Sequence, residues 1–301
     1  MSHSAKYMDT ECKSALNRVK GMGFRWSLNP YRGCVHGCHY CFARRYNAFH
    51  DLNPSGDFSG LVFVKSNVVE VLRAELSRPT WPRDVVAIGT ATDPYQPIEG
   101  ARRLTRGCLE ALAERRTPLQ LITKGTMVQR DVDVLADAAR RGGASVCMSI
   151  TTMDETLWRD LEPGTPTPLR RMQTVERLAA AGVHAGVLLA PVVPGITDDQ
   201  EHLEAVVEAA AAHGAAFLHL NVLHLQPGTR EHFMDWLAER RPRLHSVYQR
   251  LYTDTYAPKV LQYDIADRVS ELMDAYGLKE RRFDGWWQPG QPHRQLALTR
   301  V

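Results

Sequence analysis

The chain has 301 residues, of which 44% are hydrophobic and 24% are charged, and its formal net charge at pH 7 is +3. This length suits one large domain or two small ones, and the composition is close to the average of soluble globular proteins. No segment approaches the roughly 18 to 20 consecutive apolar residues that a membrane-spanning helix needs. The small positive charge does not by itself indicate a nucleic-acid-binding protein, because such proteins usually show a more extreme balance.

The N-terminal 24 residues lack the apolar stretch and the small-residue cleavage site of a secretory signal. We therefore expect a cytoplasmic protein without a membrane partner. The six cysteines of the chain are then expected to be reduced and free to bind metal.

Short, largely apolar runs predict the strands of a parallel sheet that is buried on both faces. In chain order they cover residues 24–29, 84–90, 119–123, 145–150, 184–190 and 217–223. Apolar residues at spacings of three and four predict amphipathic helices over residues 99–116, 130–141, 169–181 and 198–213. Thr197, Asp198 and Asp199 offer N-cap side chains to the last of these helices. Gly182 and Gly214 stand where helix ends favour a left-handed residue.

Strand and helix alternate through six units, which predicts an α/β fold with right-handed crossovers and helices outside the sheet. Six units are too few for a closed eight-stranded barrel, so we predict a partial (β/α)6 barrel with N- and C-terminal extensions. A flat doubly wound sheet is the alternative. The expected division is an N-terminal extension (residues 1–24), the barrel (25–240), and a C-terminal helical segment and tail (241–301). In both folds the chemistry belongs at the carboxyl ends of the strands.

The tail at residues 281–301 follows a predicted helix near residues 265–276 and shows no helical period. It combines Arg281, Arg282 and Arg294 with Trp286 and Trp287, the basic and aromatic ingredients of a platform for single-stranded bases. The alternative is that the tryptophans anchor the segment on the core.

Three of the cysteines lie within the stretch NPYRGCVHGCHYCFARRY, residues 29–46, directly after the first predicted strand. They are Cys34, Cys38 and Cys41, and glycines in the same loop allow backbone to approach a bulky inorganic group closely. A structural zinc needs four ligands, and His36 or His39 would have to supply the fourth. Iron–sulfur clusters favour closely spaced thiolates, and three thiolates on a four-iron cluster leave one iron open for a substrate.

The other cysteines stand alone in the sequence. Cys147 lies inside a predicted apolar strand and Cys108 inside a predicted helix, so packing explains both. Cys12 stays unassigned.

The CxxxCxxC spacing, with the aromatic Tyr40 before its last cysteine, resembles the motif of the radical S-adenosylmethionine (SAM) superfamily. Within that superfamily the chain is most similar to the spore photoproduct lyase-like branch. The supporting stretches are TDPYQPIE at residues 92–99, TKG at 123–125 and SITT at 149–152.

The resemblance implies an enzyme in which Cys34, Cys38 and Cys41 hold a [4Fe-4S] cluster whose fourth iron binds SAM. An electron from a reductant such as flavodoxin or ferredoxin would cleave SAM to a 5′-deoxyadenosyl radical, which abstracts hydrogen from a substrate. The implied SAM-binding residues are Tyr40, Thr92, Asp93, Lys124, Ser149 and Thr151.

Among these residues, the resemblance assigns Thr92 and Asp93 to the amino group of SAM, Lys124 to its carboxylate and Ser149 to its ribose. The alternatives are an Asp-Pro turn in which Asp93 accepts backbone donors, a solvated surface lysine, and a serine hydroxyl bonded to its own backbone. His224, at the end of the last predicted strand, is either a packed histidine or a catalytic one.

Two residues depart from the lyase pattern. Thr90 stands near the place of the hydrogen-donating cysteine of those lyases, and Phe42 stands where they carry a tyrosine. Neither side chain donates hydrogen as a thiol or a phenol does, so reversal of thymine dimers is not carried over.

We predict hydrogen-abstraction chemistry of lyase or transferase type, with a nucleic acid or nucleotide as the favoured substrate class. Radical modification of a peptide or small natural product is the alternative within the same chemistry. Outside that chemistry, a non-catalytic iron–sulfur protein and a hydrolytic barrel with a structural zinc stay open.

Overall fold

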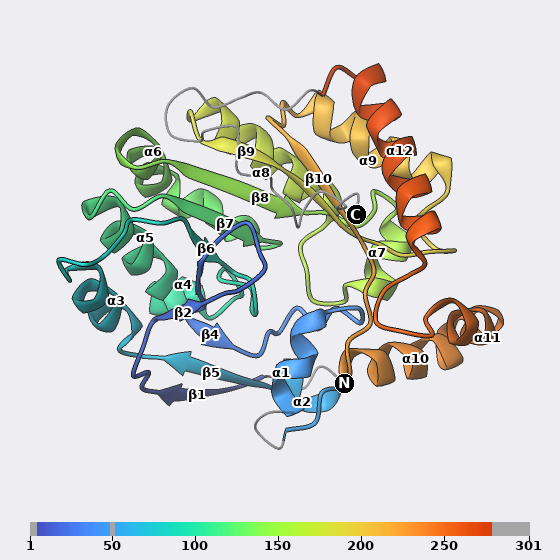
Figure 1. Cartoon of the computed structure of the whole chain (residues 1–301), viewed down its shortest axis with the longest axis horizontal. Helices are drawn as coiled ribbons and strands as arrows, with labels where there is room; N and C mark the ends of the chain where they lie inside the picture. Colours follow the sequence, from blue (N-terminus) through green and yellow to red (C-terminus); the bar gives the residue numbers. More distant parts are fainter. Residues whose placement is uncertain (1–4, 49–51, 279–301) are drawn as a thin grey trace.

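The computed structural model describes residues 5–48 and 52–278, and its centre is a curved seven-stranded sheet (Figure 1). The strand order is β10-β9-β8-β7-β6-β3-β2. Six strands run parallel: β3 (Trp26–Leu28), β6 (Val86–Ile88), β7 (Leu119–Thr123), β8 (Ala144–Ser149), β9 (His184–Val192) and β10 (Leu218–Val222). The six expected strands are present in the expected order, and the sheet does not close among the described residues, so the partial barrel is confirmed.

Helices follow the strands and lie outside the curve of the sheet (Figure 1). They are α3 (Val68–Leu76), α4 (Glu99–Arg102), α5 (Leu104–Glu114), α6 (Val132–Arg141), α8 (Pro168–Ala180) and α9 (Gln200–Ala212). Asp199 caps α9 by accepting the backbone N–H of His202, and Gly182 and Gly214 have positive φ, as predicted.

One predicted helix is wrong in detail, because the segment over residues 99–116 is broken at Arg103. This residue adopts a left-handed conformation with φ of 51° between α4 and α5. The buried carboxylate of Glu99 turns back and accepts the backbone N–H groups of Thr105 and Arg106. A side chain from the start of one helix thus satisfies free N–H groups at the start of the next.

The N-terminal segment contributes one strand to each of the two described sheets. A smaller sheet has the order β1-β5-β4, formed by β1 (Lys6–Thr10), β5 (Leu61–Lys65) and β4 (Tyr31–Arg32). β2 (Leu16–Arg18) pairs antiparallel with β3 at the edge of the main sheet. The boundary near residue 24 therefore separates two paired strands, and the proposed domain division stays a prediction.

Between β10 and residue 278 the chain forms three helices: α10 (Thr229–Arg240), α11 (Pro242–Leu251) and α12 (Lys259–Ala275). α12 packs against α9, whereas α10 packs against η1 (Phe42–Arg44), the short helix that follows the cysteine motif. Residues 281–301, for which we predicted a base-binding or core-anchored tail, lie outside the described residues. No helix in the described part of the chain is both long and apolar enough to span a lipid bilayer.

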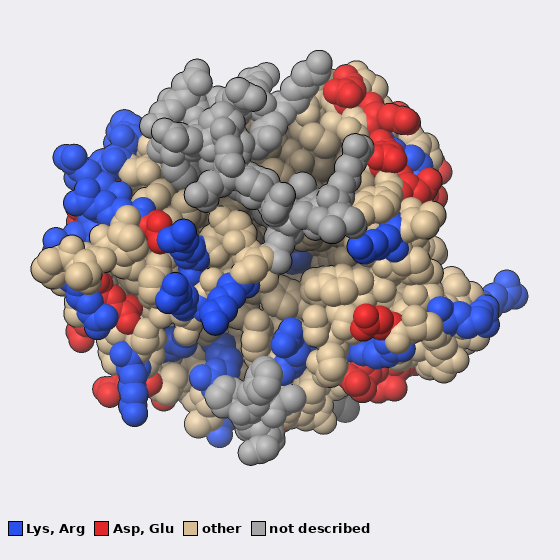
Figure 2. Space-filling model, in the orientation of Figure 1, with Lys and Arg blue, Asp and Glu red and all other residues tan. Residues whose placement is uncertain are grey.

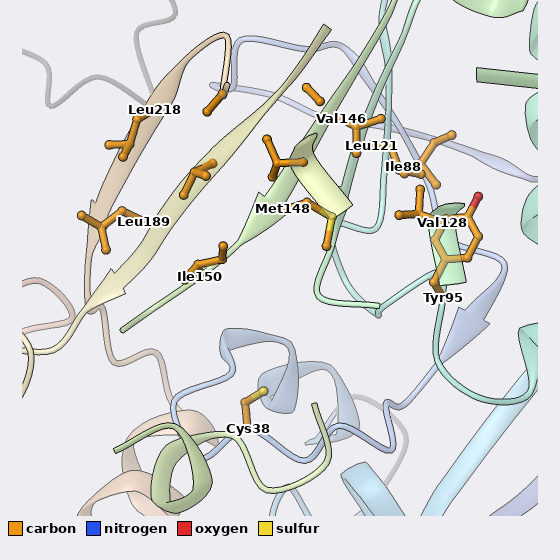
Figure 3. Close-up of a cluster of buried hydrophobic side chains, with 14 of the residues drawn as sticks. Cys38, Ile88, Tyr95, Leu121, Val128, Val146, Met148, Ile150, Leu189 and Leu218 are labelled. Atoms are coloured by element: carbon orange, nitrogen blue, oxygen red, sulfur yellow. The ribbon is translucent and has the colours of Figure 1, made fainter. Parts of the chain in front are cut away.

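The core lies between the strands and the helices. Ile88, Leu121, Val146 and Leu189 come from four strands of the main sheet and are fully buried. Figure 3 shows these side chains above Cys38, which lies on a loop beyond the strand ends. Cys108 and Cys147 are also fully buried in the packed interior, as predicted. The apolar core thus reaches the cysteine loop, because Cys38 and Tyr40 belong to the same buried cluster.

Candidate cofactor site

The three cysteines of the motif share one loop between β4 and η1. Cys34 and Cys38 are buried, and Cys41 is half-buried. Burial raises the pKa of Cys38 well above its ordinary value. The charge of Lys124 lowers it, and the charges of Glu162, Cys41 and Cys34 raise it. Burial also raises the pKa of Cys41. Thiols in this environment become thiolates only beside a cationic partner such as a metal centre.

The backbone of the loop is held in a shape that most residues cannot adopt. Gly33 and Gly37 have φ of +79° and +63°, and a Cβ on Gly33 would lie 2.4 Å from the carbonyl oxygen of Leu61. From inside the loop, the buried guanidinium of Arg44 donates to the carbonyl oxygens of Gly37 at 2.7 Å and Cys38 at 3.1 Å. The cysteines therefore stand on a preformed loop.

His39, within the motif, is held by the C-terminal helices. Its Nδ1 lies 3.0 Å from Nε2 of His232 on α10, and Nδ1 of His232 lies 2.9 Å from the hydroxyl of Ser55. Burial and the charge of Arg44 lower the pKa of His39 to about 4 and that of His232 to about 3. Both rings are neutral at pH 7, and Nδ1 of His39 is occupied by its contact with His232.

A buried polar network lies beside the loop. The Tyr40 hydroxyl donates to the carboxylate of Glu162 and lies 2.9 Å from the hydroxyl of Thr151, while Arg171 forms an ion pair with Glu162. Burial raises the pKa of Glu162, but the charges of Arg171 and Lys124 and the hydrogen bonds to it bring that pKa to about 2. Burial, and then the charge of Glu162, raise the pKa of Tyr40 well above its ordinary value. At neutral pH the network holds an ionised glutamate and a protonated tyrosine.

Lys124 and Ser149 follow neighbouring strands and meet at the edge of this network. The ammonium Nζ of Lys124 donates to the Ser149 hydroxyl at 2.7 Å and lies 5.5 Å from the centre of the Tyr40 ring. The Ser149 hydroxyl donates in turn to the carbonyl oxygen of Ala190 at 3.1 Å. Four of the six implied SAM-binding residues, namely Tyr40, Lys124, Ser149 and Thr151, therefore lie together.

Asp93 is occupied by donors of its own chain. Its carboxylate accepts the backbone N–H of Tyr95 at 2.8 Å, the hydroxyl of Thr123 at 2.6 Å and the backbone N–H of Lys124 at 2.7 Å. Nδ1 of His36 lies 3.3 Å from the same carboxylate. Burial raises the pKa of Asp93, but the charge of His36 and the hydrogen bonds lower it to about 2. This geometry is that of an Asp-Pro turn whose carboxylate accepts backbone donors.

Thr92 connects the loop after β6 to the cysteine loop. Its hydroxyl donates to the carbonyl oxygen of Gly33 at 2.6 Å. The side chain of Gln96 also donates to Gly33 and accepts the backbone N–H of Val35 at 3.2 Å. Gln96 was not among the predicted site residues, although it belongs to the stretch TDPYQPIE.

Comparison with protein families decides the class of this site. Residues 28–208 match the family model described as "Radical SAM superfamily". The chain belongs to the radical SAM superfamily. Membership indicates an enzyme that cleaves SAM by radical chemistry, and it agrees with the resemblance seen in the sequence.

Relatives with similar sequences match this radical SAM protein beyond the residues of the family model. An uncharacterized protein of Mycobacterium tuberculosis (strain ATCC 25618 / H37Rv) is 44% identical over 294 residues, which cover 96% of this chain and 85% of the relative. A radical SAM Nalpha-GlyT isomerase of Pseudomonas phage M6 is 28% identical over 179 residues, covering 58% of this chain and 35% of the phage protein.

Solved structures confirm the fold, and several of those that match are structures of spore photoproduct lyase. A mutant of that enzyme with bound AdoMet and dinucleoside spore photoproduct matches with a TM-score of 0.67 and 13% identity. The match covers 90% of this chain and 79% of the lyase. Streptococcus suis SuiB bound to S-adenosylmethionine matches with a TM-score of 0.51 and 11% identity, over 83% of this chain and 47% of SuiB.

The donor set fits the iron–sulfur cluster of a radical SAM enzyme. Three thiols share a loop that glycines and Arg44 hold in place, next to polar groups at the strand ends. Within residues 5–48 and 52–278, no three His, Cys, Asp or Glu side chains converge as a single metal ion would require. A four-iron cluster instead takes each thiolate on a different iron, so its ligands stand farther apart.

The two departures from the lyase pattern have local roles. The Thr90 hydroxyl accepts a hydrogen bond from the side chain of Asn29 at 3.3 Å. The centre of the Phe42 ring lies 6.3 Å from that of Tyr46 and 5.8 Å from that of His224. Both residues are therefore tied to neighbours of the cysteine loop, and neither supplies a thiol or a phenol.

Proposed function

We propose that this radical SAM enzyme cleaves SAM at a [4Fe-4S] cluster held by Cys34, Cys38 and Cys41 and then abstracts hydrogen from a substrate. The observation that carries the proposal is the presence of three thiols on one loop beyond the strand ends. When bound, the cluster and SAM supply the electron transfer and the carbon–sulfur cleavage that yields the 5′-deoxyadenosyl radical. A flavodoxin- or ferredoxin-type protein is the reductant class that we propose.

The polar groups of the chain would bind and orient SAM. The ammonium of Lys124 and the hydroxyl of Ser149 offer donors to its carboxylate and ribose. Glu162 and Arg171 hold Tyr40 and the end of β8 in place, because Arg171 also donates to the carbonyl oxygen of Ser149 at 2.7 Å. Asp93 acts as a positioning residue in this proposal, since it accepts the backbone N–H of Lys124.

An aromatic row next to the cysteine loop supports a substrate that carries a nucleobase. The rings of Phe42, His224 and Tyr256 follow one another at centroid distances of 5.8 and 5.7 Å, and Tyr256 is exposed. Burial and the charge of Arg45 lower the pKa of His224, so its ring is neutral. Flat rings beside a guanidinium are the groups on which bases stack.

Surface charge does not separate into one purely basic face. Figure 2 shows Lys and Arg side chains on the side of α5 and α6, but Arg106 pairs with Asp133 and Arg141 pairs with Asp137 on these helices. One of the similar structures, however, holds a dinucleoside. We therefore propose a nucleic acid or nucleotide substrate, in preference to a peptide.

Anaerobic reconstitution tests the chemistry. The protein is loaded with iron and sulfide, reduced with dithionite and given SAM, and 5′-deoxyadenosine is measured by mass spectrometry. We expect product from the wild type and from Cys12→Ala, in which a half-buried cysteine outside the loop is replaced, and none from Cys38→Ala. Equal product from Cys38→Ala and the wild type would refute the assignment of the cluster ligands.

Binding of oligonucleotides tests the substrate class. Single-stranded DNA or RNA should bind with an affinity that falls linearly with salt on logarithmic axes. Tyr256→Ala should lose about 1 to 3 kcal/mol of binding free energy, the worth of one stacked base. Tyr7→Ala, which removes an exposed tyrosine from β1, should lose none. Salt-independent binding, or equal loss in both variants, would count against a nucleic acid.

A further inference from the structure

Arg44 is a fully buried cation whose side chain is held by backbone carbonyl groups. Its side chain donates to four carbonyl oxygens: Gly37 at 2.7 Å, Pro54 at 2.8 Å, Ser55 at 3.1 Å and Cys38 at 3.1 Å. The guanidinium also lies 4.8 Å from the centre of the Phe58 ring. Among the carboxylates of residues 5–48 and 52–278, none forms an ion pair with it.

Such an arrangement is costly for a protein that never binds an anion there. Taking a charge out of water costs several kcal/mol, and carbonyl dipoles and an aromatic face recover only part of this cost. Buried arginines therefore usually have a carboxylate partner, as Arg171 has in Glu162. The absence of a carboxylate at Arg44 within the described chain calls for another source of negative charge.

The cysteines are that source. Burial lowers the pKa of the Arg44 guanidinium, and negative charge on Cys41, Cys38 and Cys34 acts in the opposite direction. Two of the four bonded carbonyls, those of Gly37 and Cys38, also belong to the cysteine loop.

We propose that Arg44 is the built-in counter-charge of the iron–sulfur cluster and raises its reduction potential. The inference rests on the proposed function, because it assumes a cluster on the three thiolates. Adding one electron makes the cluster more negative, and a fixed cation in a low-dielectric site stabilises the more negative state. Arg44 donates only to backbone carbonyls, so it is a positioning residue whose charge acts at a distance.

The test is a redox titration of reconstituted protein with dithionite and mediators, followed by electron paramagnetic resonance. Arg44→Gln keeps hydrogen-bond donors but removes the charge, and its midpoint should shift to more negative potential. We expect the equilibrium constant for reduction to fall at least about tenfold, which equals 59 mV for one electron. Arg44→Lys keeps the charge and should shift by less than a third of that amount.

Arg32→Gln is the matched control. Arg32 also stacks on a phenylalanine, 5.3 Å from the Phe63 ring, and its altered pKa has burial rather than the cysteines as its cause. Its midpoint should equal that of the wild type. A wild-type midpoint in a fully loaded Arg44→Gln, or equal shifts in Arg44→Lys and Arg44→Gln, would overturn the inference while the proposed function stands.

Variants of Arg44 that fail to bind a cluster also test the inference. If Arg44→Gln takes up no iron but Arg44→Lys does, the charge is what the loop requires, because lysine cannot bridge four carbonyls. If neither variant loads, the fork of hydrogen bonds is what matters and the inference is wrong. If the wild type itself forms no cluster, the proposed function fails and takes this inference with it.

Discussion

Arg44 and Arg171 are both 1% exposed, yet the protein balances their charges in different ways. Arg171 faces the carboxylate of Glu162, which also accepts a hydrogen bond from the Tyr40 hydroxyl. The positive charge of Arg171 is therefore balanced by a side chain of the protein itself. Arg44 instead donates to backbone carbonyl oxygens, two of which belong to the cysteine loop. The strand ends thus balance their charges within the chain, whereas in our proposal the cluster supplies the negative charge beside Arg44.

The largest expected effect on stability comes from breaking the buried ion pair between Glu162 and Arg171. Glu162→Gln keeps the shape of the side chain but leaves Arg171 buried without its anion. Removal of one partner of a buried ion pair typically costs about 3 to 5 kcal/mol, so the free energy of unfolding should fall by that amount in urea.

Two further variants test the physical reason. Glu162→Gln/Arg171→Met removes both charges and should recover part of the loss, because an apolar pair of similar volume is tolerated. Glu155→Gln breaks the exposed pair with Arg159 and should cost less than about 1 kcal/mol. A double variant as unstable as Glu162→Gln would mean that packing, and not charge, sets the cost.

The Glu162–Arg171 pair should also make the stability of the wild type depend on pH under acidic conditions. The pKa of Glu162 is about 2 in the folded protein and has an ordinary value of 4.5, so the unfolded chain takes up the proton first as the pH falls. The stabilisation is therefore complete above about pH 4.5 and is lost toward pH 2. Between pH 5 and pH 3 this residue should cost the wild type about 2 kcal/mol.

The measurement is urea unfolding at both pH values. The Glu162→Gln/Arg171→Met variant lacks the titrating group, so its stability should fall by about 2 kcal/mol less than that of the wild type over this range. Parallel losses in the two proteins would show that other carboxylates govern the acid response.

Lys124 separates ligand binding from scaffold stability. Lys124→Met removes the ammonium that faces Ser149, and a hydrogen bond to a charged group is worth about 1.5 to 3 kcal/mol. We expect the affinity of the reconstituted protein for SAM to fall at least about tenfold in equilibrium dialysis, while the unfolding free energy of the SAM-free protein falls only by the worth of the lost bond to Ser149. Lys13→Met, at an exposed position, provides the control. Unchanged SAM affinity would remove Lys124 from the binding site.

The parallel strands and the cysteine loop could be predicted because their signals are local. Apolar runs, glycines and thiols at fixed spacing need no distant partner to be recognised. The small sheet could not be predicted, since Lys6 on β1 pairs with Leu61 on β5 and the side chains of β1 are largely exposed. A strand without an apolar face leaves no periodic pattern.

The charged residues of the site were hidden for a similar reason. Arg44 and Arg171 each stand next to another arginine, Arg45 and Arg170, and in both pairs only one side chain is buried. Burial depends on partners far along the chain or on carbonyl oxygens, which carry no sequence signal. Glu162 was missed because nothing local shows that Tyr40 would reach it from across the site.

The smallest effect should come from the contact that joins α10 to the cysteine loop. The buried hydroxyl of Thr229 donates to the carbonyl oxygen of Cys41 at 3.0 Å. Thr229→Val keeps the shape but removes this donor, and one neutral hydrogen bond is worth about 1 kcal/mol. Urea unfolding should show that loss, whereas the exposed Thr253→Val should show none. The cluster potential should stay at the wild-type value in both variants, because Thr229 carries no charge; a shift like that of Arg44→Gln would instead mean that loop position, rather than the guanidinium, sets the potential.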